Sequence, residues 1–345
     1  MRITYVVAVH NSADHLETTV AKVVARLRAH PGSEVLLVEN GSSDDSPEIA
    51  QRLAASQSSP QPSGDSSGSS APGSSNSVSV AYTTSATGLG FAFRRGLELA
   101  VGDVVVLTAS DLPFGFTDLD AYLGLDDPRP ALVMGSKGHR DSVTDVSALR
   151  RVLSAGFRLL RLATLGIRYA DTQGTLILER NLITRIAPLL ACDDYLITTE
   201  IVAWAERSGA RCVEVPVTYP RAESSTVSPL RDSVRMAAGL LRLSRRLDDH
   251  AVAAIDSVVD PRLVTRVHAT APLKRAVVAG GAVVIATCVL LGTVILPLLA
   301  VALAGRLLTH VGLSAHPQVA AALTWSACVL GAALVMLRVR HGSRS

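Results

Sequence analysis

Short runs of apolar residues alternate with longer segments whose apolar positions recur at helical spacing, from Ile3 to about Arg221. The runs are rich in β-branched residues and are bounded by turn-forming residues, which is typical of buried strands. They predict strands at Ile3–Val9, Glu34–Val38, Val78–Tyr82, Val104–Leu107, Leu132–Gly135, Thr175–Leu178 and Val213–Val217. Helices are expected at Leu16–Arg28, up to Arg52, from Gly88 to about Ala100, at Ala148–Leu165 and up to Arg207. Strands that alternate with helices predict an α/β fold with a largely parallel sheet.

The pattern changes in two places. Residues 56–79 are rich in Ser, Gly and Pro and predict a flexible, low-complexity insertion. Pro229–Asp248 is amphipathic and basic, which is typical of an interfacial helix. Two apolar stretches follow, one from Ala276 that Pro297 interrupts and one over about Val319–Leu337, each near the ~20 residues that span a bilayer.

The two apolar stretches predict a transmembrane hairpin. Basic residues lie outside both ends of it, whereas only Arg306 lies near the connection, so the positive-inside rule places both termini and the globular domain in the cytoplasm. We therefore expect a globular α/β domain over 1–222, a loop with interfacial helices over 223–273, and the hairpin with a basic tail over 274–345. The hairpin has too few charges for a transport path, which favours simple anchoring or a homo-oligomer.

Composition supports attachment to a lipid bilayer. Hydrophobic residues make up 48% of the 345 residues, and the mean hydropathy of +0.33 is too high for an ordinary soluble protein. Aromatic residues make up only 4% and the net charge is only +3, so nucleic acid is not an expected partner and the basic residues suit anionic lipid or phosphate. The four cysteines have no ligand spacing and indicate neither zinc nor a disulfide framework. The first ten residues turn polar too early for a signal peptide.

Polar groups follow three of the predicted strands. Asp111 comes at the end of a buried strand, where open α/β sheets bind ligands, and it suits either a divalent cation or a plain turn cap. Glu39 and the turn after it suit either a base or ribose contact or a helix cap. Gly88 and Gly90 would let the backbone approach a phosphate or ribose, although the dinucleotide fingerprint is not met.

The order of these parts resembles that of a known enzyme family. The motifs are His10-Asn11-Ser12, Glu39-Asn40-Gly41-Ser42, Gly88-Leu89-Gly90-x-Ala92-x-x-x-Gly96, Ser110-Asp111-Leu112, Gly135-Ser136-Lys137, Arg150 with Ser154, Asp171-Thr172-Gln173, Glu200 and Glu214-Val215-Pro216-Val217. The first of them are similar to those of the inverting family-2 glycosyltransferases, which have the Rossmann-like GT-A fold. The later ones narrow the resemblance to the dolichyl- and polyprenyl-phosphate sugar synthases. The resemblance implies that residues 1–222 form a GT-A glycosyltransferase domain and that the loop within 223–273 binds the acceptor.

The resemblance implies roles for individual residues. Catalysis would fall to Asp111, Lys137, Arg150 and Ser154, with Asp111 holding Mg²⁺ or Mn²⁺. The nucleotide sugar would contact Val9, Asn11, Glu39, Asn40, Gly88, Gly90, Ser110, Asp171, Gln173 and Glu200. The lipid phosphate would contact Arg150, Ser154 and Arg221, and the pattern of residues 171–173 favours a UDP-sugar. We expect Arg151, Arg158 and Arg161, on the same helix as Arg150, to face lipid headgroups.

This chain also departs from the family's pattern. The usual Asp-x-Asp is Ala109-Ser110-Asp111, and Pro113 stands where a polar residue often follows. One carboxylate with diphosphate oxygens and water can still hold Mg²⁺, although with lower affinity.

Three functions remain open at this point. The favoured one is inverting transfer of a single sugar from a nucleotide sugar to polyprenyl phosphate at the cytoplasmic membrane face, for cell-envelope glycosylation. A sugar hydroxyl acceptor would instead need a general base, for which Asp193 or Asp194 would be the candidate. The third is a non-catalytic scaffold that lost its metal site.

Overall fold

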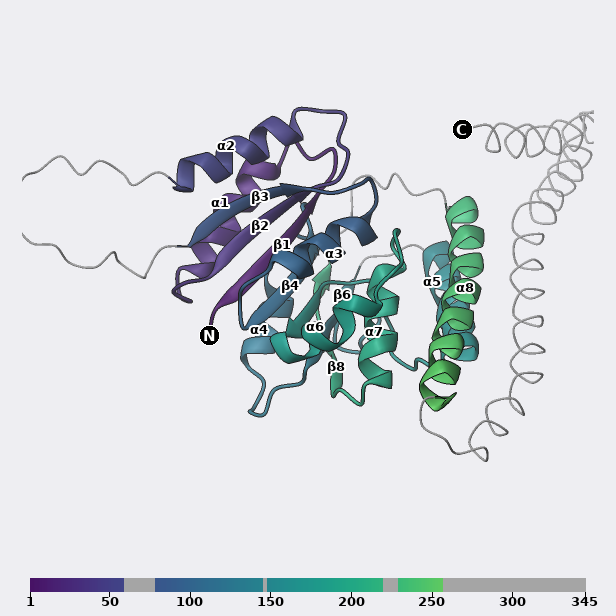
Figure 1. Ribbon diagram of the computed structural model, residues 1–345. Coiled ribbons are helices and arrows are strands. Elements are labelled where there is room, and N and C mark those ends of the chain that lie inside the picture. Colours follow the sequence, from purple (N-terminus) through teal and green to yellow (C-terminus); the bar gives the residue numbers. More distant parts are fainter. Residues whose placement is uncertain (59–77, 145–147, 220–228, 257–345) are drawn as a thin grey trace, which may run out of the picture. The chain divides into compact units, whose positions relative to one another are not determined.

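The computed structural model describes residues 1–58, 78–144, 148–219 and 229–256, and every structural statement below concerns these residues (Figure 1). The chain divides into two compact units, Met1–Lys274 and Arg275–Ser345. The second unit, with the predicted transmembrane hairpin, lies outside the described residues, as do most of the low-complexity insertion and the loop that carries Arg221. No helix within the described ranges is both long enough and apolar enough to cross a membrane.

The described strands form a mixed seven-stranded sheet and a small two-stranded one. The large sheet has the order β3-β2-β1-β4-β7-β5-β8, and β7 runs antiparallel to both of its neighbours, β4 and β5. Its strands are β1 (Ile3–Val9), β2 (Glu34–Glu39), β3 (Ser79–Thr84), β4 (Val104–Ala109), β5 (Leu132–Ser136), β7 (Leu176–Glu179) and β8 (Cys212–Pro216). The small sheet pairs β6 (Val143–Thr144) with β9 (Thr218–Tyr219). The expected α/β fold is therefore confirmed, with a mixed rather than a purely parallel sheet.

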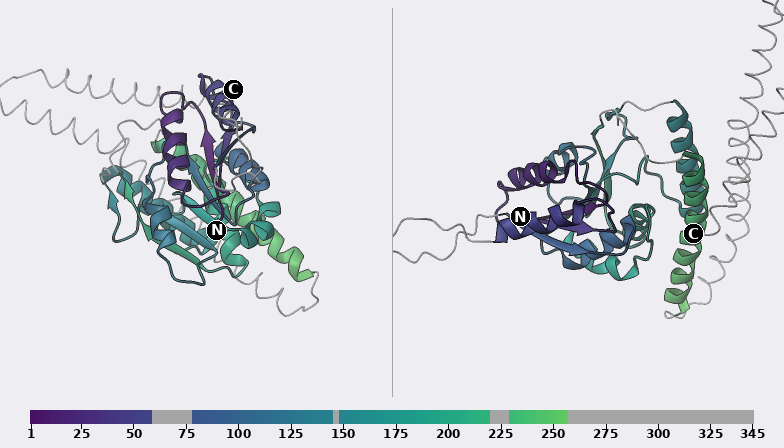
Figure 2. Two further views of the ribbon diagram at one scale, coloured as in Figure 1. Left: turned by 90° about the vertical axis from the view of Figure 1, so that its left-hand side faces the viewer. Right: turned by 90° about the horizontal axis from the view of Figure 1, so that it is seen from above.

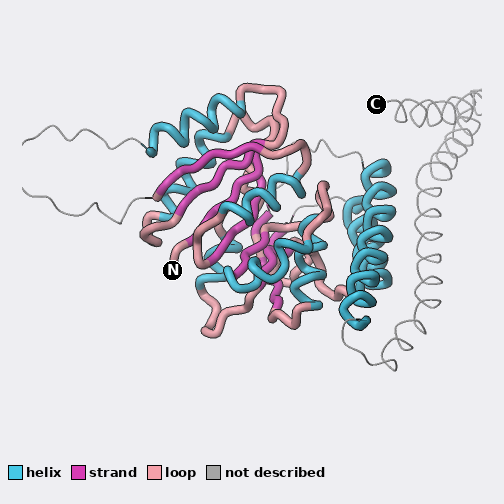
Figure 3. The backbone as a smooth tube through the Cα atoms, viewed as in Figure 1, coloured by secondary structure: helices cyan, strands magenta, loops and turns pink. Residues whose placement is uncertain are grey.

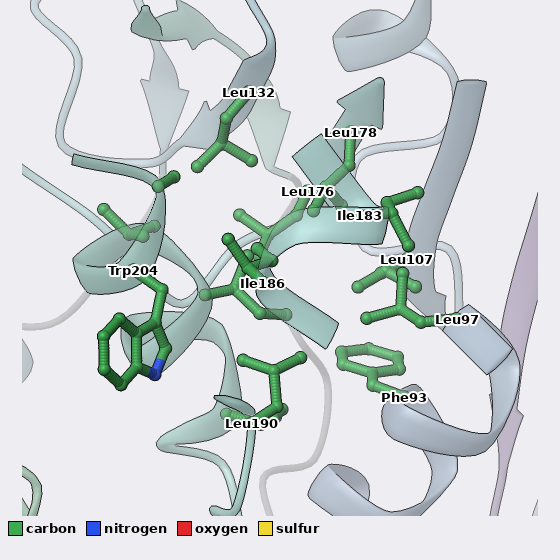
Figure 4. Packing of buried hydrophobic residues seen from close by; sticks show 14 of the residues in the cluster. Phe93, Leu97, Leu107, Leu132, Leu176, Leu178, Ile183, Ile186, Leu190 and Trp204 are labelled. Atoms are coloured by element: carbon green, nitrogen blue, oxygen red, sulfur yellow. The ribbon is translucent and has the colours of Figure 1, made fainter. Parts of the chain in front are cut away.

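Helices cover both faces of the large sheet. The helices are α1 (Leu16–Leu27), α2 (Ser46–Ser58), α3 (Leu89–Leu99), α4 (Thr117–Leu123), α5 (Ala148–Leu165), α6 (Arg180–Ile186), α7 (Ile197–Arg207) and α8 (Pro229–Asp256). Because side chains alternate along a strand, Tyr5 and Val7 of β1 pack in one core cluster with α1, α2 and α4. Val6 and Ala8 pack in the other, with α3, α6 and α7. Figure 4 shows this second cluster, in which Phe93 and Leu97 approach the leucines of the sheet.

The predicted and observed elements agree closely where the apolar pattern is strong. The ranges Ile3–Val9 and Ala148–Leu165 are reproduced without change as β1 and α5. Helix α2 continues to Ser58, two residues beyond the expected start of the insertion, and β3 begins at Ser79. The two seven-residue helices α4 and α6 were not predicted, because fewer than two turns leave no readable helical period.

Helix α8 packs along α5, and the two helices lie side by side in Figures 1 and 3. Its apolar stripe is used inside the domain: Leu240, Leu243 and Leu247 are all buried. The Ser244 hydroxyl donates a hydrogen bond of 2.9 Å to the carbonyl oxygen of Thr164 on α5. The view from above in Figure 2 shows the same pairing. The described part of this amphipathic helix thus buries its leucines against protein, where a lipid contact was expected.

Candidate functional site

Polar loops gather at one edge of the large sheet. Strands β1, β2, β3 and β4 are mutually parallel, and β5 points the same way because the antiparallel β7 lies between it and β4. The loops that follow these strands therefore all leave at the carboxyl edge, which is where ligands bind in open α/β sheets. All the predicted donor contacts from Val9 to Ser110, and Asp111 and Lys137 as well, lie in or next to these loops.

The loops after β1 and β2 are joined to each other by side chains. Asn11 has a left-handed backbone with φ of +49°, and its Oδ1 accepts hydrogen bonds from the backbone N–H of Ser43 (2.8 Å) and from its hydroxyl (3.2 Å). The Glu39 carboxylate accepts the backbone N–H of Ser42 at 2.5 Å. Both side chains thus shape the turn after β2, and only 7% of Glu39 is exposed. The helix cap that the sequence left open as an alternative lies further along the turn, where Oδ1 of Asp44 accepts the backbone N–H of Ser46, the first residue of α2, at 3.1 Å.

Val9 and Asn40 fix the ends of their strands through the backbone. The carbonyl oxygen of Val9 accepts the N–H of Asn40 at 3.0 Å, and the carbonyl oxygen of Asn40 lies 3.2 Å from Nδ1 of His10. Val9 and Asn40 are both buried, whereas His10 and Asn11 are exposed. The side chains that an incoming ligand meets first at this corner are therefore those of His10 and Asn11.

Ser110 and Asp111 have opposite surroundings. Ser110 is buried, and its hydroxyl lies 2.6 Å from that of Ser12 and 3.3 Å from Nε2 of His15. Its carbonyl oxygen accepts the Thr19 hydroxyl at 2.7 Å, so this residue locks β4 to the start of α1. Asp111 is exposed, and its carboxylate makes no hydrogen bond or ion pair within the described ranges.

Asp111 is thus open to a cation. The described residues contain no group of three or more His, Cys, Asp or Glu side chains that could hold a metal ion by themselves. Mg²⁺ is commonly held by one or two carboxylates together with substrate phosphates and water. An exposed single carboxylate at the carboxyl edge fits that donor set, provided that the substrate supplies the remaining oxygens.

Lys137 lies just beyond β5 in an aromatic and acidic setting. Its Nζ is 3.6 Å from the Asp171 carboxylate, 5.8 Å from the ring centre of Phe114 and 5.4 Å from that of Tyr219. Phe114 belongs to the same loop as Asp111, so the loops after β4 and β5 adjoin. Cation–π contacts hold an ammonium while leaving part of it to solvent, and about a third of the Lys137 side chain is exposed.

Asp171 and Gln173 form one compact turn. The Asp171 carboxylate accepts the backbone N–H groups of Lys137 (3.3 Å) and Gln173 (2.9 Å). The N–H groups of Ala170 and Asp171 both donate to the carboxylate of Glu214 on β8, at 2.9 Å each. The structure therefore brings Lys137, Asp171 and Gln173 together.

Gly88 and Gly90 begin α3 against the loop before α7. The N–H of Gly90 donates to the carbonyl oxygen of Asp193 at 3.0 Å, and Gly88 has φ of +135°. A Cβ atom on Gly90 would lie 2.1 Å from the carbonyl oxygen of Cys192, a distance that real contacts do not reach. These glycines are therefore required by close packing between two backbones, whatever else they contact.

Glu200 is fully buried, with no exposed surface. Its carboxylate accepts the N–H groups of Ala191 (3.1 Å) and Cys192 (2.7 Å) and forms an ion pair with Arg246 of α8. In this structure Glu200 joins the loop before α7 to α8.

The predicted acceptor residues are only partly described. Arg150 and Ser154 lie one turn apart on α5, and Ser154 is exposed. The side chain of Arg150 and the whole of Arg221 are outside the described residues. On the same helix Arg161 was expected to face lipid, and this is wrong: it is only 1% exposed, because it is turned into the domain beneath residues 169–172.

Sequence reasoning missed several residues around this edge. His15, Thr19 and Ser43 contact the predicted positions through hydrogen bonds that span 30 to 95 residues of sequence, and Phe114 and Tyr219 hold Lys137. Only Phe114 carried a readable signal, since it follows Asp111 by three residues and is a large apolar residue in an otherwise turn-like segment.

A mixed sheet covered by helices on both faces, with polar loops and an open carboxylate at its carboxyl edge, defines a Rossmann-like GT-A domain. The model of the family described as "Glycosyl transferase family 2" matches residues 4–182, and the chain belongs to that family. This confirms the family, and with it the glycosyltransferase class, that the order of the motifs implied.

One curated relative is the glycosyltransferase AglD of Haloferax volcanii, which is 25% identical over 284 residues. The match covers 81% of this chain but only 41% of that relative. Among solved structures, glucosyl-3-phosphoglycerate synthase from Mycobacterium tuberculosis, in complex with Mn²⁺, UDP-glucose and phosphoglyceric acid, is 19% identical, with 70% of this chain and 79% of that chain covered and a TM-score of 0.49. The same synthase with Mg²⁺ and UDP is 21% identical at the same coverage, with a TM-score of 0.47.

Proposed function

We propose that this protein transfers a single sugar from a nucleotide sugar, a UDP-sugar, to polyprenyl phosphate, with inversion at the anomeric carbon. The observation that carries the proposal is the adjacency of the Asp111 and Lys137 loops, joined through Phe114. One loop offers a carboxylate for a cation that binds diphosphate, and the next offers an ammonium for an anionic acceptor. Donor and acceptor phosphates would thus meet at one edge of the sheet.

The state of Asp193 and Asp194 supports an anionic acceptor. A sugar hydroxyl must lose its proton to a positioned base, whereas a phosphate monoester is already an anion at neutral pH. Asp193 is paired with Arg94 at 2.5 Å, and Asp194 accepts the backbone N–H of Leu196 at 3.0 Å at the start of α7. Both candidate bases are therefore engaged in holding the structure.

On this proposal catalysis is positioning together with charge stabilisation. Asp111 would hold Mg²⁺ or Mn²⁺, and a cation bound there would supply positive charge to stabilise the leaving diphosphate. Lys137, with Arg150 and Ser154 of α5, holds the attacking phosphate. Asn11 and Glu39 shape the turns against which the nucleoside rests. Attack from the face opposite the nucleotide inverts the anomeric centre, and no residue needs to remove a proton.

The reaction is tested with the full-length chain in detergent. The chain is incubated with radiolabelled UDP- and GDP-sugars, polyprenyl phosphate and Mg²⁺, and lipid products are resolved by chromatography and mass. We expect one UDP-sugar to give a lipid-linked monosaccharide that mild acid cleaves. If no donor gives a lipid product while a free sugar acceptor is glycosylated, the acceptor is a hydroxyl. If calorimetry finds neither UDP nor Mg²⁺ binding, the protein is a non-catalytic scaffold.

We also propose that the reaction takes place at the cytoplasmic face of the cell membrane. Support comes from the two apolar stretches after Lys274 and the basic residues that flank them. Membrane fractionation of the full chain and of a variant ending at Lys274 tests this proposal. We expect only the full chain to stay in the membrane after a carbonate wash, and retention of both forms would contradict the hairpin anchor.

A further inference from the structure

Residues 169–172 run between two charges of opposite sign, one buried and one half-buried. Arg161 of α5 approaches from one side and Glu214 of β8 from the other, and within the described residues they form no hydrogen bond or ion pair with each other. Both side chains instead end on the loop that lies between them. This loop carries Asp171, the partner of Lys137.

Arg161 is the largest fully buried side chain among the described residues. One guanidinium nitrogen, Nη1, donates to Oγ1 of Thr172 at 2.9 Å, and Nη2 donates to the carbonyl oxygen of Tyr169. Burying a guanidinium is costly unless its N–H groups are satisfied, and a leucine would fill the same place in a core at less cost. The two contacts with the loop are what this residue adds.

Thr172 passes the constraint to a third element. Its hydroxyl accepts a hydrogen bond from Arg161, so its own proton is free to be donated to Oγ1 of Thr199 on α7 at 2.8 Å. Thr172 and Thr199 are both fully buried. The orientation of this hydroxyl is therefore fixed from both sides.

Glu214 fixes the same segment from the strand side. Each of its carboxylate oxygens accepts one backbone N–H, from Ala170 and from Asp171. Burial lowers the pKa of Arg161, and the negative charges of Asp171 and Glu214 oppose that change. Four consecutive residues, 169 to 172, are thus each held by at least one of the two charged side chains.

We infer that Arg161 and Glu214 are positioning residues, which set the backbone of residues 169–172 so that Asp171 meets Lys137 and Gln173 in the geometry required for sugar transfer. The inference rests on the proposed function for its catalytic consequence. Its structural part, local ordering of the loop, holds whatever the reaction is.

The test compares Arg161→Met, Arg161→Lys and Glu214→Gln with Arg158→Met, a matched control on an exposed arginine of the same helix. Hydrogen exchange measured by mass spectrometry on the full chain follows the peptide that spans residues 166–175. We expect exchange there to accelerate about tenfold or more in Arg161→Met and Glu214→Gln, since each loses charge-assisted hydrogen bonds. Arg161→Lys keeps one donor and should fall between the wild type and Arg161→Met.

Kinetics form the second readout. In Arg161→Lys we expect kcat to fall about tenfold while the Kd for UDP, which lacks the sugar, changes less than about threefold in calorimetry, because the β1 and β2 loops are untouched. If loop exchange is faster in the variants but neither they nor the wild type transfer sugar, the positioning role stands and the proposed reaction is refuted. Unchanged loop exchange, or equal loss of protection throughout the domain with an unchanged kcat in Arg161→Lys, would refute the positioning role.

Discussion

The two ends of the carboxyl edge are built by different physical means. At the end formed by β1, β2 and β4, the loops are held mainly by short polar side chains such as Asn11 and Ser110, which bond to backbone or to hydroxyl groups of the next loop, and the buried Glu39 carboxylate is the exception. At the end formed by β5, β7 and β8, the supports are charged side chains: Arg161 and Glu200, which are buried, and Glu214, which is half-buried. Neutral contacts tolerate change and adapt to a ligand, whereas buried charges fix one arrangement and are costly to break. The difference suits a first end that adapts to the bound nucleotide and a rigid second end that positions the acceptor.

Loss of the open carboxylate should have the largest effect on activity. We expect Asp111→Asn to lower transfer more than about a hundredfold, because the cation that neutralises the leaving diphosphate loses its protein ligand. Initial rates over a Mg²⁺ titration measure this loss. Asp126→Asn, an exposed carboxylate elsewhere, is the control and should transfer at the wild-type rate. Metal-dependent transfer that survives in Asp111→Asn would place the reaction centre elsewhere.

The largest stability effect is expected at the other end. Glu200→Ala leaves two backbone N–H groups and Arg246 without their acceptor in a buried setting. Breaking a buried pair in this way costs about 3–5 kcal/mol, so Tm should fall by roughly 6–20 °C for a domain of this size. Thermal unfolding by circular dichroism measures it. A fall in Tm no greater than that caused by a change at an exposed residue, such as Glu48→Ala, would show that Glu200 does not hold this end of the sheet edge.

The contact between α3 and the loop before α7, which joins the two ends, is tested at Gly90. A methyl group there would lie within 2.6 Å of both Cys192 and Asp193 backbone atoms, so Gly90→Ala must push α3 away from the loop before α7. We expect a loss of about 1–3 kcal/mol and weaker UDP binding by calorimetry. Gly156→Ala is the matched control: nothing lies within 4 Å of the new methyl group, and the change should raise stability by about 0.5–1 kcal/mol, since alanine favours helices. Equal stability and equal UDP binding in the two variants would contradict close packing between α3 and that loop.

The smallest effect concerns pH. Burial raises the pKa of Asp118 on α4 above its ordinary value of 3.8, although the N–H of Leu119 and the hydroxyl of Thr175 oppose the change. The folded state therefore binds the proton more tightly than the unfolded state, and stability falls as the pH rises from about 3.8 through the folded pKa. Urea unfolding of wild type and Asp118→Asn between pH 4 and 7 should show a smaller fall in the variant, by about 1.4 kcal/mol for each unit of pKa shift removed. If the free energies of unfolding of the two proteins fall in parallel between pH 4 and 7, Asp118 is not the origin of the pH dependence.

Within the described residues, the fold and the positions of the site were largely readable from the sequence. Strands such as Ile3–Val9 are continuous apolar runs, and helices such as Ala148–Leu165 keep a helical period over several turns. Asp111 was singled out because it follows a predicted strand, and strand ends in an α/β sheet mark the ligand edge, whereas Asn11 and Lys137 were assigned through the family resemblance. The short helices α4 and α6 carry no such period and were missed.

The surroundings of the charged residues were not readable. Arg161 belongs to a helix whose other arginines include the exposed Arg158, and its sequence gives no reason to separate the two. Its burial depends on Thr172 and on the carbonyl oxygen of Tyr169, which α5 meets only when β7 and α7 are in place. The amphipathic stripe of α8 was likewise predicted correctly, but lipid was the wrong partner for its leucines, since only the folded domain brings α5 beside them.

By itself, the sequence determined the alternation of strands and helices, the glycosyltransferase family and the carboxyl-edge residues, because each depends on neighbours close in the chain or on the order of short motifs. The tertiary structure decided which of those side chains are open and which are engaged: Asp111 is exposed, Asp193 and Asp194 are already paired, and Arg161 and Glu214 hold the loop between them. The physical reason is that burial and hydrogen bonding of a charge depend on groups from other elements, such as Arg94, which is 99 residues from Asp193, and only the packed domain fixes their approach.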